Sequence, residues 1–556
     1  MRSYIKNIIS ILSQTERKKL GLYIFLDIII SIADTAFLAF LLFVVHFYIQ
    51  PEGTTRYNFL PSWLHDNDSL FLVSSLVILF SIKNLAGFLI YRAECKFIGH
   101  VATRLSQAKL LQYLDGKFED YVNTDSSVHI RRICFQPFEF CQYILSGILQ
   151  IFTQLFLITL TIIAILLFNA KLFLLLICIL LPPVVIVFYF IKKRLTATKL
   201  QMQSSNERSF QYVLDALKGY VEGNIYNRTD FFLQRFITHR RRFSKYLFDS
   251  LSMQNMPSRV IEIFAVTGLF MLIVIAKWSG NNNSSAFIII GAFMAAAYKI
   301  IPGIVKVINL TGQIKAYEIS VEDLSWVGHE RKTINEKSRA DAIDSIIFRD
   351  ISFYHAELPV LNNFDLSISK GELVGISGRS GRGKTTILNL LLGFLAPQKG
   401  QILVNGIVME NESLKKYWPL ISYVRQQPFL IHDTILKNIT LDETGYDMDK
   451  LEFALKISGL DDFISSLPEK LEKVITENGK NISGGQQQRI ALARALYKDA
   501  VVILLDEPFN ELDEASEIIL LEHFRKLAET GRLVIMITHD TRSLSYCHKI
   551  ISLNEQ

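Results

Sequence analysis

A glycine-rich segment between two apolar runs holds the residues with the clearest chemical purpose. The segment GRSGRGKTT follows ELVGIS and leads into ILNLLLGF, so it is predicted to join a strand to a helix. Loops of this kind direct backbone N–H groups towards phosphate oxygens at a helix N-terminus, where the helix dipole favours anions. Lys384 would reach the β- and γ-phosphates of a nucleotide, and Thr385 would offer its hydroxyl to Mg²⁺. The residues of this predicted phosphate loop are Gly378, Arg379, Ser380, Gly381, Arg382, Gly383, Lys384, Thr385 and Thr386.

A second apolar run, VVILLDE, ends in two acidic residues, Asp506 and Glu507. It predicts a buried strand that delivers carboxylates to its C-terminal end, where ligands bind in open α/β sheets. Asp506 would hold Mg²⁺ through water, and Glu507 would orient and deprotonate an attacking water. Taken alone, the pair could instead be a strand end followed by helix-capping acids. Beside a phosphate loop, the catalytic interpretation is favoured.

A third segment, Asn481-Ile482-Ser483-Gly484-Gly485-Gln486, opens the amphipathic run QQRIALARAL. Its turn would present N–H groups and the Ser483 hydroxyl to an anion at another helix N-terminus. Together the three segments resemble those of ATP-binding cassette (ABC) proteins, and the whole chain resembles an ABC exporter half-transporter of the type IV fold. This resemblance implies a dimer in which the signature turn of one subunit (Ser483, Gly484, Gly485, Gln486) closes on ATP held by the phosphate loop of the other.

The resemblance also assigns roles to residues between and after these segments. Gln426 corresponds to the Q-loop glutamine, which contacts Mg²⁺, so the implied metal ligands are Thr385, Gln426 and Asp506. Residues 510–513 correspond to the D-loop, which ends in Asp513. His539 corresponds to the switch histidine that contacts the γ-phosphate, and either Tyr354 or His355 would stack on adenine. The chain departs from the usual pattern at Ile482 and at 508–510, and neither departure removes a catalytic group.

The composition shows what must position these residues. Of 556 residues, 50% are hydrophobic and 20% are charged, which is too apolar for a soluble multidomain enzyme. The apolar residues concentrate in the first 310 positions, so a membrane half precedes a soluble half. Basic cytoplasmic loops beside spans explain the net charge of +6, and a nucleic-acid partner is not expected. Six stretches reach the roughly 20 residues needed for a span, at about 21–48, 69–92, 139–168, 171–192, 258–279 and 284–308.

The gaps between the stretches set the topology. The gaps at 93–138 and 193–257 are rich in Lys and Arg, which predicts that they and both termini are cytoplasmic. We interpret both gaps as helical extensions of the spans that turn at short cross-helices within 118–132 and 214–230, and the last span as running on towards residue 326. The predicted domains are a transmembrane domain at 1–327, a linker at 328–342 and a cassette at 343–556. In the cassette, strand-like runs alternating with helices predict a mainly parallel α/β sheet; they are 346–353, 372–378, 401–406, 501–506, 533–538 and 549–553.

Charged residues within the spans are functional candidates because charge is costly in lipid. Asp34 and Lys83 reach similar depths, which favours an ion pair between the first two spans. Lys299 and Lys306 lie seven apart on the last span, where they would line a cavity for an anionic headgroup or pyrophosphate. Pairing with a carboxylate, or snorkelling to the interface, is the alternative for these two lysines.

These features predict an ATPase that exports or flips an amphipathic substrate across the cell membrane. ATP and Mg²⁺ are the expected cofactors, and the expected partners are a second copy or a paralogous half-transporter, membrane lipids and the transported molecule. FEDYVNTDSS, LDALKGYVEGN and AAYKIIPG resemble the lipid-linked oligosaccharide flippase group, which favours a lipid-like cargo. A peptide or drug exporter is the alternative. An ATP-gated regulatory or channel-like protein is less favoured because Glu507 and His539 are both present.

Overall fold

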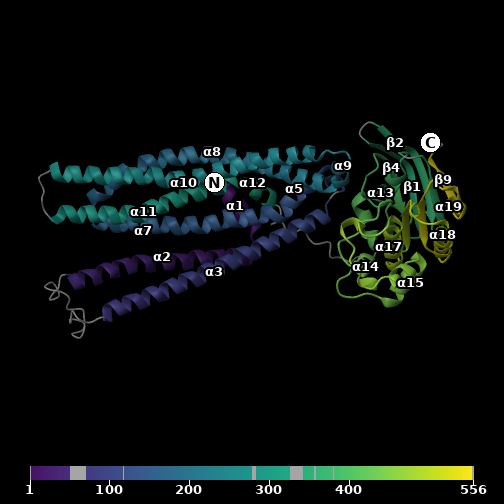
Figure 1. Cartoon of the computed structure of the whole chain (residues 1–556), viewed down its shortest axis with the longest axis horizontal. Coiled ribbons are helices and arrows are strands. Elements are labelled where there is room, and N and C mark those ends of the chain that lie inside the picture. The colour runs from purple at the N-terminus through teal and green to yellow at the C-terminus, as the bar shows by residue number, and fades with distance from the viewer. Residues whose placement is uncertain are drawn as a thin grey trace. The chain divides into compact units, whose positions relative to one another are not determined.

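A computed structural model describes residues 2–49, 71–116, 118–168, 170–278, 284–325, 342–355, 358–379 and 381–553. The chain divides into two compact units (Figure 1). The first comprises Met1–Gly116 and Asp120–Arg331, and the second comprises Lys117–Glu119 and Lys332–Gln556. The linker predicted at 328–342 and the gap between the first two predicted spans, at about 49–68, fall almost entirely outside the described residues, as does Asn169 in the gap between the third and fourth.

The first unit is built from long helices. After the short α1 (Arg2–Ile11), they are α2 (Gln14–Ile49), α3 (Phe71–Leu114), α7 (Ser146–Phe168), α8 (Ala170–Lys218), α10 (Thr229–Trp278) and α11 (Ser284–Ala316). With 49 and 50 residues, α8 and α10 are each about 75 Å long, more than twice the thickness of a bilayer core. Both helices therefore extend well beyond any membrane they cross.

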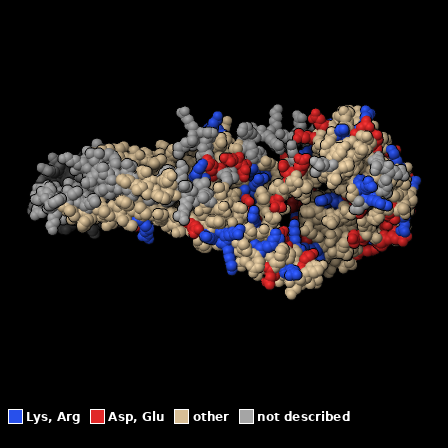
Figure 2. All heavy atoms as spheres, turned by 90° about the horizontal axis from the view of Figure 1, so that it is seen from above, with Lys and Arg blue, Asp and Glu red and all other residues tan. Residues whose placement is uncertain are grey.

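Apolar side chains face outwards along parts of these helices. Among the described residues, three helical segments are long and apolar enough to span a bilayer: Gln14–Phe37, Ser74–Leu114 and Ser126–Ile163. On α3, Ile82, Leu85 and Phe88 are each about 60% exposed, as expected of side chains that face lipid. Figure 2 shows a long stretch of the first unit that carries few charged side chains. The first unit is thus a membrane domain.

Short helices occupy the predicted turning points. α4 (Phe118–Asn123) and α5 (Ser126–Ile130) lie within the first gap, and α9 (Tyr220–Ile225) lies within the second. Two π-helical turns, Arg131–Phe135 and Phe140–Leu145, flank α6 (Gln136–Glu139) before α7 begins. The last predicted span does run on past residue 308, but it does not continue as one helix towards residue 326. α11 ends at Ala316, Tyr317 leaves helical geometry, and α12 (Glu318–Leu324) begins a new helix.

The second unit holds two sheets. The first is antiparallel with order β2-β1-β4-β5, formed by β1 (Ser345–His355), β2 (Leu358–Ser369), β4 (Lys399–Val404) and β5 (Ile407–Met409). The second is parallel with order β6-β7-β8-β3-β9, formed by β3 (Leu373–Ser377), β6 (Ile421–Val424), β7 (Val502–Asp506), β8 (Leu533–Ile537) and β9 (Lys549–Ser552). The assignment of all six predicted runs to one mainly parallel sheet is wrong for two, since 346–353 and 401–406 lie in the antiparallel sheet.

The parallel sheet is buried on both faces, which explains its continuous apolar strands. Alternate residues of β8 enter different apolar clusters: Ile535 packs with α13 (Lys384–Leu391), and Met536 packs with α17 (Gly484–Tyr497) and α18 (Glu514–Glu529). All five residues of β7 and of β8 are buried. This rigid centre fixes the loops that leave the carboxyl ends of its strands.

Candidate nucleotide-binding and catalytic site

The predicted phosphate loop connects β3 to α13. Lys384 is the first residue of α13, and its Nζ donates to the carbonyl oxygen of Gly378, 2.7 Å away. Gly383 adopts φ +86°, and a Cβ there would lie 2.9 Å from Cγ1 of Val360, so only glycine fits. Arg379, Gly381 and Arg382 are exposed, Gly378 is buried and Thr386 is half-buried; Ser380 lies outside the described residues.

Asp506 ends β7 beside the start of α13. The hydroxyl of Thr385 donates to Oδ2 of Asp506 at 3.3 Å, so the structure brings together two of the three predicted metal ligands. Asp506 is 5% exposed, and burial raises the pKa of its carboxyl above the ordinary value. Tyr423, on β6, faces the same carboxylate; burial first, and then the charge of Asp506, raises the pKa of Tyr423 to about 12. A hydroxyl and a carboxylate at this spacing are hard oxygen donors of the type Mg²⁺ prefers.

Glu507 lies at the centre of the site with its side chain 13% exposed. Its Oε2 accepts hydrogen bonds from Nε2 of Gln426 at 2.6 Å and from Nδ2 of Asn510 at 2.9 Å. Its Oε1 lies 3.9 Å from Nζ of Lys384 and 3.6 Å from Nδ1 of His539. The structure thus gathers the predicted base, Q-loop glutamine, loop lysine and switch histidine around one carboxylate.

The backbone of Glu507 is strained. Its φ is +49°, in the left-handed region that costs a residue other than glycine about 1–2 kcal/mol. The conformation is held from outside, because its N–H donates to the carbonyl of Ile537 on β8 at 2.9 Å. Strain that persists under such a restraint is common where a side chain must be aimed at a substrate.

The signature turn starts α17. Ser483 and Gln486 form a reciprocal capping box: the Gln486 N–H donates to the Ser483 hydroxyl at 3.3 Å, and the Ser483 N–H donates to Oε1 of Gln486 at 2.9 Å. A Cβ on Gly484 would lie 2.9 Å from a carboxylate oxygen of Glu511, and one on Gly485 would lie 2.8 Å from the Glu511 carbonyl oxygen. The D-loop therefore packs directly on the two glycines of the turn.

Asp513, the last D-loop residue, has a structural role in this chain. Its carboxylate caps α18 by accepting from the Ser516 N–H at 2.9 Å and hydroxyl at 2.7 Å, and it accepts from Arg489 at 2.9 Å. The Ser516 hydrogen bonds, with Arg489 contributing, lower the pKa of Asp513 below its ordinary value. The capping bonds fix the end of the D-loop.

The two candidates for adenine stacking end β1. Their position is fixed by Gln398, whose side chain accepts from the Tyr354 N–H at 3.1 Å and donates to its carbonyl at 3.2 Å. Tyr354 is half-buried, and the exposed His355 ring packs edge-on against Phe353 with centroids 5.3 Å apart. Both remain candidates.

The structure describes a partner for only some of the charged residues predicted within the spans. Lys83 forms an ion pair with Asp34, and its ammonium lies 5.1 Å from the centroid of the Phe80 ring. Lys306 is exposed on α11, and the side chain of Lys299 lies outside the described part of the chain. The cavity suggested for these two lysines therefore stays a prediction.

The sequence did not reveal that two further side chains contact the carboxylates of the site. Asn510 donates to the carboxylate of Glu507, and Tyr423 faces Asp506. The only signal for Asn510 was its departure from the usual residue at that D-loop position. Tyr423 could have been inferred from its place on a strand three residues before Gln426.

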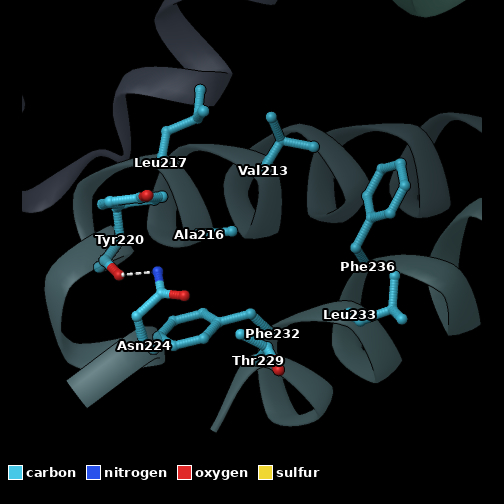
Figure 3. A pocket seen from close by; sticks show the side chains of 11 residues that line it. Val213, Ala216, Leu217, Tyr220, Asn224, Thr229, Phe232, Leu233 and Phe236 are labelled. Carbon is cyan, nitrogen blue, oxygen red and sulfur yellow. Dashed lines mark hydrogen bonds between the residues drawn. The ribbon is translucent and has the colours of Figure 1, made fainter. Parts of the chain in front are cut away.

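The first unit also contains an unpredicted pocket of about 410 Å³ between the end of α8, α9 and the start of α10 (Figure 3). Phe232 lines it and lies so close to Gly219 that a Cβ there would be 2.9 Å from the ring. Asn224 donates to the Tyr220 carbonyl at 2.6 Å, while the Tyr220 residue is 72% exposed. This short cross-helix therefore offers an apolar surface.

This geometry defines a P-loop nucleotide-binding domain in one chain with a helical membrane domain, and comparison with known proteins gives the family. The description "ABC transporter transmembrane region" matches residues 20–297, half of the chain, and "ABC transporter" matches residues 361–510. The chain belongs to the ABC transporter family and is a multi-pass membrane protein.

The chain is also similar to individual ABC proteins and to a solved structure. It is 28% identical to the ATP-dependent lipid A-core flippase of Burkholderia orbicola, over 65% of this chain and 62% of that protein. It is 38% identical to the leukotoxin translocation ATP-binding protein LktB of a Pasteurella haemolytica-like species, over 38% of this chain and 30% of that protein. The matched part spans 62% of the length of the flippase relative. A structure of a bacterial Atm1-family ABC exporter with ATP bound aligns with TM-score 0.79 and 18% identity, covering 98% of this chain and 94% of that one. This likeness confirms the predicted fold.

Proposed function

We propose that this protein is an ATP-driven exporter or flippase that works as a dimer and moves an amphipathic, lipid-like substrate. The observation that carries the proposal is the convergence of Lys384, Gln426 and His539 on the carboxylate of Glu507. These residues come from the carboxyl ends of four parallel strands, where open α/β sheets bind nucleotides.

Each residue has a defined task in the proposed reaction. Backbone N–H groups of the phosphate loop and Lys384 bind the ATP phosphates. Thr385, Asp506 and Gln426 are the residues that would hold Mg²⁺, which would neutralise charge on the phosphates when bound. Glu507 accepts a proton from the attacking water through Oε1, while His539 contacts the γ-phosphate. Hydrolysis consumes one water and yields ADP and phosphate.

The proposed dimer explains the signature turn. Its N-capped helix α17 presents N–H groups at an end that favours anions, and in the dimer it would meet ATP on the partner's phosphate loop. The partner is a second copy or a paralogous half-transporter. The cross-helices of the two long loops would transmit closure of the cassettes to the spans.

The membrane arrangement follows from the sequence. We propose six spans within 1–327, a linker at 328–342 and a cassette at 343–556, in the cell membrane with both termini and the cassette in the cytoplasm. The flippase relative favours a lipid-like substrate, and the leukotoxin relative keeps a peptide or protein cargo as the second candidate. Lys299 and Lys306 are the proposed contacts for an anionic headgroup.

The base role is tested with Glu507→Gln in the purified full chain. We expect ATP binding to persist and turnover to fall by about 10²–10⁴-fold, since a neutral amide cannot accept the proton. Glu452→Gln, an exposed position on α15 (Met448–Ser458), is the matched control. Hydrolysis by the Glu507 variant at near wild-type rates would remove Glu507 from this role.

The substrate is tested in proteoliposomes with lipid-linked glycans, peptides or lipophilic cations. Selective stimulation of ATPase by the lipid-linked glycan, reduced in Lys299→Ala and Lys306→Ala, supports the lipid-like cargo. Stimulation by peptides alone would move the protein to the second candidate. No ATPase in any mixture would count against an active pump.

A further inference from the structure

Among the described residues, four side chains surround the carboxylate of Glu507, and three of them have another task once ATP binds. Lys384 is drawn to the phosphates, Gln426 to Mg²⁺ and His539 to the γ-phosphate in the proposed reaction. Asn510 is the remaining contact, and the proposed reaction gives it no other partner. We propose that Asn510 is the positioning residue that orients Glu507 as the general base throughout the ATPase cycle. This inference rests on the proposed role of Glu507.

The two hydrogen-bond acceptors of Glu507 are used differently. Oε2 accepts from Asn510 at 2.9 Å, while Oε1 lies on the side of Lys384 and His539. Because Lys384 marks where the phosphates bind, Oε1 is the oxygen that faces the attacking water. An amide donor on Oε2 blocks rotation of the carboxylate and leaves the lone pairs of Oε1 free for the proton.

The chain on either side of Asn510 is fixed. Phe509 is 7% exposed and packs towards the Phe524 ring with centroids 6.4 Å apart. The Leu512 N–H donates to the Phe509 carbonyl at 2.9 Å, and Asp513 caps the helix that follows. This turn is therefore anchored by a buried ring on one side and a capped helix on the other, and it presents the Asn510 amide at one place.

The geometry of Asn510 also excludes a simple capping role. Its Nδ2 reaches back three residues to the side chain of Glu507, and the N-cap of α18 is supplied by Asp513 instead. The backbone of Glu507 is already held at φ +49° by Ile537, so only the side-chain torsions remain to be set. Asn510 acts on those torsions.

The test compares three variants of the full chain in detergent or proteoliposomes. Asn510→Ala removes the donor, and Asn510→Asp keeps the shape but places a second carboxylate against Glu507. Asn510→Ser keeps a shorter donor. We expect kcat to fall about 10-fold for Ala, at least as far for Asp, and less for Ser, because misplacing a reacting group costs rate steeply. The KM for ATP and the affinity for a fluorescent ATP analogue should stay within about two-fold of wild type.

A double mutant separates positioning from a general structural effect. In a Glu507→Gln background, Asn510→Ala should cause no further fall in the residual rate, since the group it orients is already gone. Gln401→Ala, an exposed amide on β4 in the other sheet, is the control for loss of a surface amide. Unchanged melting temperatures would show that the variants are folded.

The outcomes are distinct. If Glu507→Gln retains turnover, the proposed base role fails and the inference falls with it. If Glu507→Gln abolishes turnover while the Ala and Asp variants of Asn510 turn over normally, the inference alone is overturned. A raised KM with unchanged kcat, or an equal fall in the Glu507→Gln background, would also overturn it, because either result places Asn510 on the nucleotide or the fold.

Discussion

The two glycines of the signature turn make different contacts, and this difference gives a quantitative prediction. A Cβ added to Gly484 would lie 2.9 Å from Oε2 and 3.3 Å from Cδ of Glu511, which are the far end of an exposed, flexible side chain. A Cβ added to Gly485 would lie 2.8 Å from the backbone carbonyl oxygen of Glu511. Neither glycine has a positive φ, so the backbone conformation of the helix accepts alanine at both positions, and only the contacts of the added Cβ differ.

The expected free energies follow from these contacts. Replacing glycine by alanine in a helix stabilises by about 0.4–1 kcal/mol. At position 484 the Glu511 side chain moves aside, so Gly484→Ala should leave the cassette as stable as wild type or slightly more so. At position 485 the D-loop backbone must shift, which costs about 1–3 kcal/mol. Gly485→Ala should therefore be less stable than Gly484→Ala by roughly 2 kcal/mol.

The assay is urea unfolding of the full chain in detergent, with fluorescence of Trp418 reporting on the cassette. A second variant, Glu511→Ala, identifies the clashing atom. It should not rescue Gly485→Ala, because alanine keeps the carbonyl oxygen. Equal stability of the two glycine variants, or rescue of Gly485→Ala by Glu511→Ala, would refute the reasoning. Gly484→Ala should still lose turnover while folded, because the proposed dimer requires that turn to lie against the partner's ATP.

Three further predictions concern other parts of the chain. Lys83→Met should destabilise the membrane domain by about 3 kcal/mol in thermal unfolding, because it leaves the charge of Asp34 unpaired. The double variant Asp34→Leu/Lys83→Met should recover most of this loss, and an equal loss in the single and the double variant would contradict the prediction. Gly383→Ala, blocked by Val360 and by φ +86°, should reduce ATP binding at least 10-fold in a fluorescent-nucleotide titration, and normal binding would show that the loop adapts. Burial lowers the pKa of His523 below its ordinary 6.5, so below about pH 6.5 the unfolded chain binds more protons than the folded chain and acid lowers the stability. His523→Leu should abolish this part of the pH dependence of stability, measured by urea unfolding. An unchanged pH dependence would refute the prediction.

Several features of the structure could be predicted from the order of apolar, glycine and charged residues along the chain. The phosphate loop was predictable because its glycines, Lys384 and Thr385 stand between an apolar strand and an apolar helix. The end of β7 at Asp506 was predictable because parallel strands buried on both faces are continuously apolar. The contact of Lys83 with Asp34, 49 residues apart, agrees with their similar depth in the first two spans.

Strand pairing could not be predicted in the same way. The runs at 346–353 and 401–406 are as strand-like as those of the parallel sheet, but hydrophobic periodicity does not specify which strand will be the neighbour. Short strands such as β5 and β6 carry too little pattern to be recognised alone. The break between α11 and α12 has no Pro or Gly at Tyr317 to signal it.

The sequence by itself determined the types of chemical group this protein possesses and the strand ends at which they stand. Only the tertiary structure decided which of them meet. The order β6-β7-β8-β3 places the loops after four separate strands at one edge, so that Gln426, His539 and Lys384 converge on Glu507. The approach of Asn510 depends on a buried Phe509 and on a strained φ at Glu507. Such contacts arise from packing between distant segments, and no local pattern in the chain encodes them.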